Sequence, residues 1–231
     1  MKTLGIIGGT APDSTIEYYR LIIERYRERV SDGSYPPLLI NSIDLKRLVD
    51  LVNAGRLADL TDFLLAEIGR LARAGADLGL LAANTPHIVF DDLARRSPIP
   101  LISIVEAACD ATLALGLKRV GLLGTRFTMQ GRFYPDVFSR RGITLCVPAE
   151  EDQAYIHDRY MSDLIKGVFP AEVRTALLAI VERLRKKEDI QGVILGGTEL
   201  PIVLGSPGEG GIPFLDTTRI HAERAVAAMV A

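Results

Sequence analysis

The sequence has no tryptophan, only two cysteines and only three histidines in 231 residues. Two cysteines as widely spaced as Cys109 and Cys146 fit neither a disulfide framework nor the ligand spacing of a zinc site. We expect both to be buried as small hydrophobic side chains, Cys109 in a helix and Cys146 at the end of a strand. Without a cluster of histidines and cysteines, the sequence predicts no metal site.

Long apolar runs and an excess of one charge are also missing. The first apolar run, residues 4–7, is too short for the core of a signal peptide or for a membrane span. The formal net charge is -2. The densest basic stretch, residues 183–187, falls where a helix is predicted to end, and cations there complement the helix dipole. We therefore expect a cytoplasmic protein that contacts neither nucleic acid nor membrane.

Short apolar runs alternate with helical patterns along the whole chain, in which 48% of residues are hydrophobic. This alternation is typical of a parallel α/β sheet, whose ligands gather at the carboxyl ends of the strands. The run LGLLAANTPH at 78–87 ends in a polar cluster, and GVILGGTELP at 192–201 repeats that pattern. GIIGGT at 5–10 recurs as GLLGT at 121–125 with nearly the same separation. The sequence thus predicts two similar halves.

The final helical pattern is expected to carry the chain back to the first half. We therefore predict a first domain of residues 1–103 plus 213–231 and a second of 104–212, with a ligand cleft between their strand ends. The first glycine loop has neither the G-x-G-x-x-G pattern nor a P-loop lysine, which argues against a nucleotide. Ser14 followed by Glu17 has the spacing of a capping box, so helix initiation alone accounts for part of that loop's polarity.

Six segments are spread over nearly the whole chain: GIIGGTAPDST at 5–15, NSIDLKR at 41–47, AANTPH at 82–87, LLGTRFTM at 122–129, ILGGTELP at 194–201 and DTTRIHAERAV at 216–226. In this order they resemble the motifs of the aspartate/glutamate racemase family. The resemblance implies two flavodoxin-like α/β domains related by a pseudo-twofold axis, usually assembled as homodimers, with the substrate enclosed between the domains. It also implies chemistry without pyridoxal phosphate, metal or nucleotide.

The resemblance further implies two catalytic cysteines, one at the tip of the central strand of each half. One thiolate removes the α-proton of the substrate, and the other thiol returns a proton to the opposite face. In this sequence the corresponding positions hold Ala83 and Gly197. Neither residue can carry a proton, and a positioned acid or base contributes ~10²–10⁴-fold to a rate. Two-thiol racemisation is therefore not expected, and the glycine favours a natural loss over an engineered one.

The remaining polar residues of these motifs are better preserved. The resemblance assigns them to the α-carboxylate and ammonium of the substrate, and hydroxyls near helix N-termini suit a carboxylate. For each threonine, an ordinary role as a helix N-cap is an equally good interpretation. The residues assigned to the α-carboxylate and ammonium are Thr10, Ser14, Asn84, Thr85, Thr125, Thr128 and Thr198, and Glu199 is a further member of the predicted substrate-binding set.

Selectivity for an acidic side chain requires a cation. The resemblance points to Arg47 and Lys166 as partners of the distal carboxylate, the first by a bidentate contact and the second as a point charge. Their alternative role is that of solvated helix residues. His87, Glu199 and His221 are the other ionisable groups in or near the motifs, and each is either a substitute acid or base or a structural hydrogen-bonding residue.

Two hypotheses follow for the function. The first is a cofactor-independent enzyme of the racemase family that acts on aspartate, glutamate or a similar dicarboxylate through other residues, or that catalyses a related lyase or isomerase reaction. The second is a noncatalytic protein that binds a small acidic amino acid or dicarboxylate. Whether the protein is an enzyme stays open at this point. Two small residues, Ala83 and Gly197, indicate space, so cysteine is expected to fit at both positions.

Overall fold

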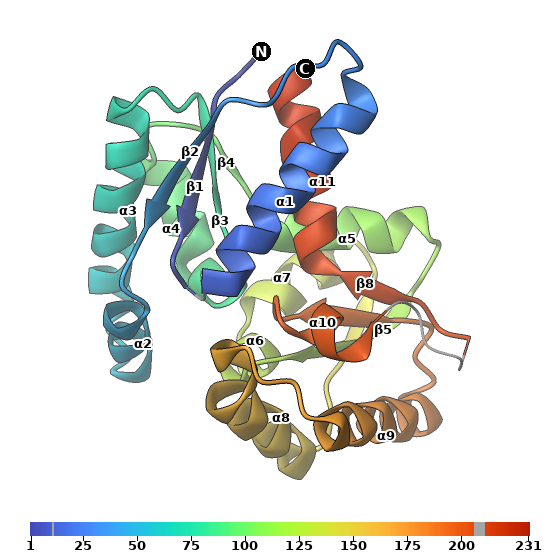
Figure 1. Ribbon diagram of the computed structural model, residues 1–231. Coiled ribbons are helices and arrows are strands. Elements are labelled where there is room, and N and C mark those ends of the chain that lie inside the picture. Colours follow the sequence, from blue (N-terminus) through green and yellow to red (C-terminus); the bar gives the residue numbers. More distant parts are fainter. Residues whose placement is uncertain (11, 206–210) are drawn as a thin grey trace. The chain divides into compact units, whose positions relative to one another are not determined.

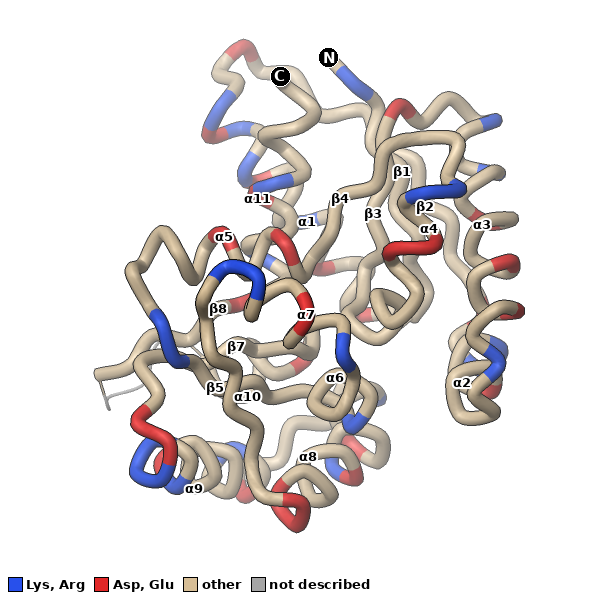
Figure 2. The backbone as a smooth tube through the Cα atoms, turned by 180° about the vertical axis from the view of Figure 1, so that it is seen from behind, with Lys and Arg blue, Asp and Glu red and all other residues tan. Residues whose placement is uncertain are grey.

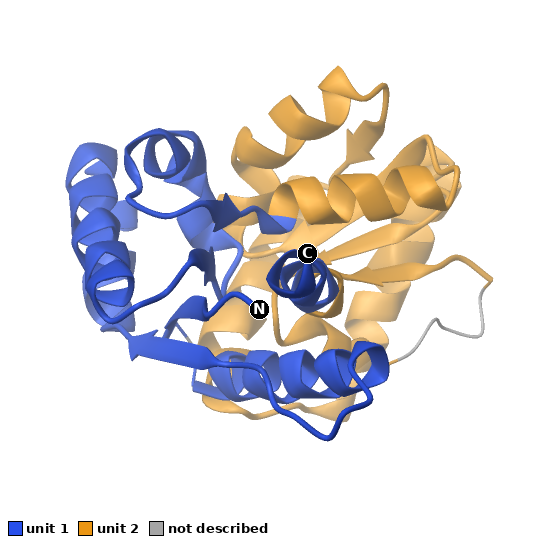
Figure 3. Cartoon of the chain, turned by 90° about the horizontal axis from the view of Figure 1, so that it is seen from above, with its two compact units in different colours: residues 1–104, 221–231 blue, residues 105–220 orange. Residues whose placement is uncertain are grey.

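The computed structural model describes residues 1–10, 12–205 and 211–231, which divide into two compact units (Figure 3). Unit 1 comprises residues 1–104 and 221–231, and unit 2 comprises residues 105–220. The second unit therefore extends beyond the boundary at residue 212 that we expected from the sequence. The physical reason is strand pairing, because the strand Phe214–Asp216 pairs in parallel with Val193–Gly196 of unit 2.

Unit 1 contains a four-stranded parallel sheet in the order β2-β1-β3-β4 (Figure 1). Its central strands are apolar and buried along their whole length, as is typical of parallel sheets covered on both faces. The strands are β1 (Leu4–Gly8), β2 (Leu38–Ser42), β3 (Leu78–Leu81) and β4 (Leu101–Ile102). The helices are α1 (Pro12–Arg29), α2 (Leu45–Asn53), α3 (Leu57–Arg73), the 3₁₀ turn η1 (Thr85–Val89), α4 (Phe90–Arg96) and the C-terminal part of α11 (Thr217–Val230).

Unit 2 repeats this topology, with a parallel sheet in the order β6-β5-β7-β8. The α/β fold class and the two similar halves predicted from the sequence are confirmed. The strands are β5 (Arg119–Gly124), β6 (Thr144–Cys146), β7 (Val193–Gly196) and β8 (Phe214–Asp216). The helices are α5 (Ile104–Ala114), α6 (Arg126–Gln130), α7 (Phe133–Arg140), α8 (Glu150–Ser162), η2 (Leu164–Lys166), α9 (Ala171–Glu188) and α10 (Leu200–Leu204).

Helices pack on both faces of the sheet in unit 1. On one face α1 and α11 lie side by side (Figure 1), and Tyr18 and Ile22 pack with Ala222 and Val226 against the strands. On the other face lies α3, whose apolar stripe is buried as its sequence period predicts. Burial of each large side chain contributes about 1.5–3 kcal/mol. The stripe comprises Leu60, Phe63, Leu64, Ile68 and Leu71.

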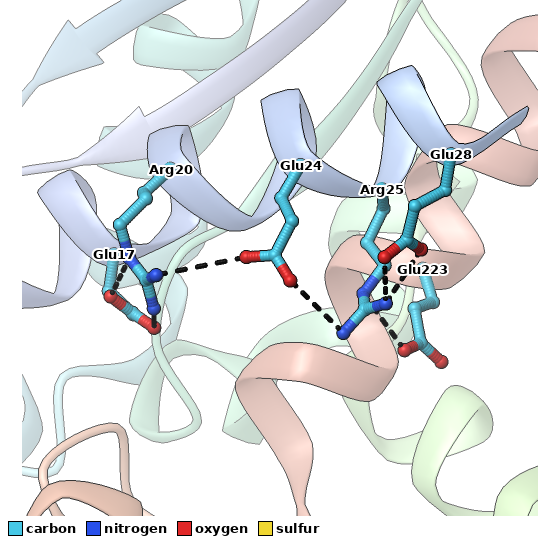
Figure 4. A network of polar contacts seen from close by, with 6 residues as sticks. All are labelled: Glu17, Arg20, Glu24, Arg25, Glu28 and Glu223. Atoms are coloured by element: carbon cyan, nitrogen blue, oxygen red, sulfur yellow. Dashed lines mark hydrogen bonds and ion pairs between the residues drawn. The ribbon is translucent and has the colours of Figure 1, made fainter. Parts of the chain in front are cut away.

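An ion-pair network on α1 reaches α11 within unit 1 (Figure 4). Arg25 is its centre, because this half-buried guanidinium contacts Glu223 at 3.2 Å, Glu24 at 3.5 Å and Glu28 at 2.6 Å. Arg20 extends the network to Glu17 and Glu24. An isolated exposed pair contributes only about 0.2–1 kcal/mol, so the contact with Glu223 matters mainly because it joins the two helices.

Charged residues are distributed over the helices and connections of both units (Figure 2). The basic stretch noted in the sequence does lie at a helix end, since Arg185, Lys186 and Lys187 form the last turn of α9. Within the described ranges, no helix combines the length and the apolar character that a bilayer crossing requires.

Candidate functional site

The strand ends of unit 1 bring the first group of predicted residues together. β1 and β3 are neighbours with Ile7 opposite Leu81, so the segments that follow them leave the sheet at the same edge. Gly9 has a φ of 81°, and a Cβ there would lie 2.4 Å from the carbonyl oxygen of Ile43. Only glycine therefore fits this turn, which starts the loop to α1.

Ser14 joins that loop to the end of β3. Its Oγ donates a hydrogen bond of 2.8 Å to the carbonyl oxygen of Ala82, and the contact is buried. The capping-box interpretation is therefore wrong. α1 begins at Pro12, so Ser14 lies inside the first turn, and Glu17 pairs with Arg20. The tertiary hydrogen bond outweighs the local one because it satisfies a buried carbonyl group.

The other predicted residues of unit 1 lie in the same loops. Ala83 and Asn84 follow β3 after one intervening residue, Asn84 is buried, and Thr85 begins η1. Thr10 lies between β1 and α1, and its Oγ1 atom is buried with no hydrogen-bond partner in the described part of the chain. A buried hydroxyl group without a hydrogen-bond partner is unusual, and such a group is suited to form a hydrogen bond with a ligand.

His87 has a structural role behind this edge. Its Nε2 accepts a hydrogen bond of 3.2 Å from the backbone N–H of Ile104, so the proton is on Nδ1, which lies 3.0 Å from the carbonyl oxygen of Ala83. Burial, with a smaller contribution from His221, lowers the pKa of His87 to about 3. The imidazole is therefore neutral and has both nitrogens occupied, which favours the structural alternative.

His221 is held in the same way by other groups of unit 1. Nε2 donates to the carbonyl oxygen of Ile102 at 2.9 Å, and Nδ1 accepts from the hydroxyl of Tyr18 at 2.8 Å. Burial lowers the pKa of His221 to about 4. Both buried histidines therefore support the chain around β3 and β4 rather than offering a free nitrogen to a substrate.

Unit 2 carries the second group of predicted residues at the ends of β5 and β7. Thr125 occupies the N-cap position of α6, and its Oγ1 lies 3.3 Å from Oγ1 of Thr128. Both threonines are buried. A Cβ on Gly124 would lie 2.6 Å from the carbonyl oxygen of Gly196, so the two strands approach closely at this edge.

The end of β7 brings the predicted residues Thr198 and Glu199 together with Tyr160, which the sequence did not predict. Thr198 Oγ1 donates to Glu199 Oε2 at 2.8 Å, and the phenol of Tyr160 in α8 donates to the same oxygen. Glu199 is 2% exposed and Tyr160 is 5% exposed. Burial, and then the charge of Glu199, raises the pKa of Tyr160 well above its ordinary value, so the phenol keeps its proton.

Tyr160 also occupies the space beside Gly197. A Cβ at residue 197 would lie 2.6 Å from Cε2 and 2.7 Å from Oη of Tyr160. The expectation that cysteine fits at both small positions is therefore wrong at residue 197 as long as this ring stays in place. No sequence signal pointed to Tyr160, because it lies within a helix and far from any of the recognised motifs.

The two natural cysteines lie elsewhere in unit 2. Cys109 is buried in α5, and Cys146 is buried at the end of the edge strand β6. Burial raises the pKa of both thiols, so they remain protonated and packed, as the sequence predicted. In residues 1–10, 12–205 and 211–231, no three His, Cys, Asp or Glu side chains are grouped so that they could hold a metal ion.

The two predicted cations, Arg47 and Lys166, are exposed. The guanidinium carbon of Arg47, in α2, lies 4.2 Å from the centre of the Phe63 ring in α3. It lines a charged groove of about 700 Å³ between these helices. Lys166 ends η2 in unit 2. Among the described residues, neither cation forms an ion pair or a hydrogen bond with a strand-end residue.

Comparison with known proteins gives consistent matches. The sequence model of Asp/Glu/Hydantoin racemases matches residues 7–225. A solved structure from Yersinia pestis, provisionally described as an Asp/Glu racemase, has a TM-score of 0.89 and 29% identity over the whole of both chains. An aspartate racemase homologue from Pyrococcus horikoshii has a TM-score of 0.83 and 35% identity, again over both whole chains. A glutamate racemase of Thermus thermophilus is 29% identical over 170 residues, which cover 71% of this chain but only 59% of that protein.

Proposed function

Because the chain belongs to the Asp/Glu/Hydantoin racemase family, we propose that it binds a small acidic amino acid such as aspartate or glutamate. The observation that carries the proposal is the set of buried hydroxyl and amide groups at the carboxyl ends of the central strands in each unit. Thr10, with its unpartnered Oγ1 among the described residues, belongs to this set in unit 1, and Thr125 and Thr128 belong to it in unit 2. Groups of this kind bind a carboxylate without placing a full charge beside it.

The proposed roles follow the family resemblance. The strand-end residues hold the α-carboxylate and the ammonium group, and Arg47 and Lys166 contact the distal carboxylate. The position of the Arg47 guanidinium over the Phe63 ring supports its role, because this contact restrains the side chain. The binding needs no cofactor. The protein is proposed to be cytoplasmic and to assemble as a homodimer. Light scattering of the purified protein tests the dimer.

We propose binding without two-thiol racemisation. Residue 83 offers only a methyl group, and the space beside residue 197 is filled by the ring of Tyr160. A second candidate is a lyase or isomerase reaction of the same ligand in which Glu199 accepts a proton. It is favoured by one observation, the burial of this carboxylate at the end of β7.

Proton NMR of L- and D-aspartate and glutamate in D₂O tests the proposal. The expected result is broadening of the ligand signals by the protein, with an unchanged α-proton signal. Arg47→Ala is expected to weaken binding of aspartate more than that of alanine. Arg56→Ala is the matched control, because Arg56 lines the same groove but is paired with Asp59. Loss of the α-proton signal would support the second candidate, and absence of broadening would refute binding.

A further inference from the structure

Tyr160 lies where a side chain of residue 197 would project. The added Cβ would be 2.6 Å, 2.7 Å and 2.9 Å from three atoms of its phenol, closer than side chains approach one another. Tyr160 also belongs to the buried hydrophobic cluster of unit 2, which includes Ile156, Leu195 and Leu200. It therefore has little freedom to move aside, because interiors as dense as this relax only in part.

The phenol fixes the neighbouring carboxylate. Glu199 Oε2 accepts hydrogen bonds from the Tyr160 hydroxyl and from Thr198 Oγ1 at 2.8 Å. These two donors are neutral groups, so they orient the carboxylate and neither of them cancels its charge. A buried carboxylate in this setting favours a cationic partner, and the cation that an acidic amino acid brings is its ammonium group.

We propose that Tyr160 is the positioning residue of the β7 strand end: its ring excludes any side chain from position 197, and its phenol holds Glu199 as the acceptor for the ammonium group of the ligand. The second half of this statement rests on the proposed function. Beside position 197, where the family resemblance implies a catalytic thiol, the structure instead has Tyr160, which orients Glu199 for recognition of the ligand. On this account the unit selects amino acids over plain dicarboxylates.

A mutant cycle in urea unfolding tests the exclusion. Gly197→Ala is expected to lower the unfolding midpoint of the otherwise unchanged protein, and to do so again in a Tyr160→Phe background, which keeps the ring. In a Tyr160→Leu background, which removes the atoms that the added Cβ meets, the loss should disappear. Gly69→Ala in α3 is the control. Its Cβ would meet only the guanidinium tip of Arg73 at 3.3 Å, so its midpoint should not fall.

The exclusion is overturned if Gly197→Ala has no effect in the unchanged protein. It is equally overturned if the loss is as large with leucine at position 160 as with tyrosine. The Phe and Leu backgrounds keep most of the buried volume, so the comparison does not depend on a variant that fails to fold.

Calorimetric titration with L-aspartate and succinate tests the role in recognition, because these ligands differ only in the ammonium group. Tyr160→Phe is expected to weaken aspartate binding about 10-fold, the effect of one hydrogen bond to a charged group, and to leave succinate binding unchanged. A purely structural role would weaken both ligands equally, which would overturn the proposal. Binding of neither ligand by the unchanged protein would refute the proposed function and the ammonium role together, while the unfolding cycle would still decide the exclusion.

Discussion

The two buried histidines of unit 1 predict a loss of stability in mild acid. In the unfolded chain both imidazoles titrate near pH 6.5. In the folded protein the pKa of His87 is lowered to about 3 and that of His221 to about 4. At a pH between the folded and the unfolded pKa of each histidine, the unfolded state binds more protons than the folded state. The stability that the neutral histidines contribute is therefore present above pH 6.5 and is lost as the pH falls towards 4.

The magnitude follows from the unfolded chain. At pH 5 each free histidine is almost fully protonated, which favours unfolding by about 2 kcal/mol per residue compared with pH 8. His87 and His221 together therefore predict a loss of about 4 kcal/mol. This is a large share of the roughly 5–15 kcal/mol that stabilises an ordinary domain.

Urea unfolding at several values between pH 8 and pH 5 measures this loss. His221→Gln keeps an N–H donor for the carbonyl oxygen of Ile102 but removes one titrating group. Without this group, unfolding between pH 6 and pH 5 takes up nearly one proton less. The slope of the unfolding free energy against pH should therefore fall by about 1.4 kcal/mol per pH unit. His157→Gln is the comparison, because His157 is only partly buried in unit 2 and should change the slope less. An unchanged slope in His221→Gln would refute the reasoning.

Three further predictions concern single residues. Ser14→Ala should destabilise the protein by about 1–3 kcal/mol in urea unfolding, because it leaves the buried carbonyl of Ala82 without this donor; no loss would remove the tertiary role of Ser14. Gly9→Ala should cost more than about 1 kcal/mol by the same measurement, since its positive φ and the nearby backbone both oppose a side chain; a neutral effect would contradict that geometry. Cys109 and Cys146 should react with a thiol reagent only after denaturation, and rapid native labelling would show that they are accessible.

The period of the apolar residues was enough to predict the two sheets and the helices that cover them. The β3 and β7 runs are buried along their length, and the α3 stripe faces the core, because burial of apolar surface dominates these choices. The limit of unit 2 was not predictable in the same way. β8 is a strand of only three residues, and its assignment depends on its partner rather than on its own pattern.

The candidate site was predictable only where its residues lie in motifs at strand ends. Ser14 was correctly singled out, but its spacing to Glu17 suggested a local bond that the fold replaces with a tertiary one. Tyr160 was missed, since it reaches the end of β7 from the last turn of α8, outside the recognised motifs. Only the folded chain shows that the small size of Gly197 is required by a neighbour.

The division of the chain has a consequence for the order of folding. Unit 2 is one continuous segment, whereas unit 1 requires residues 221–231 as well as residues 1–104. Its core lacks Ala222, Ala225 and Val226 until those residues have been synthesised. The half that leaves the ribosome first therefore completes its core last, and the later half can fold before it. During synthesis the apolar face of α1 stays exposed until α11 has been made, and an exposed apolar face of this kind is a surface to which chaperones bind.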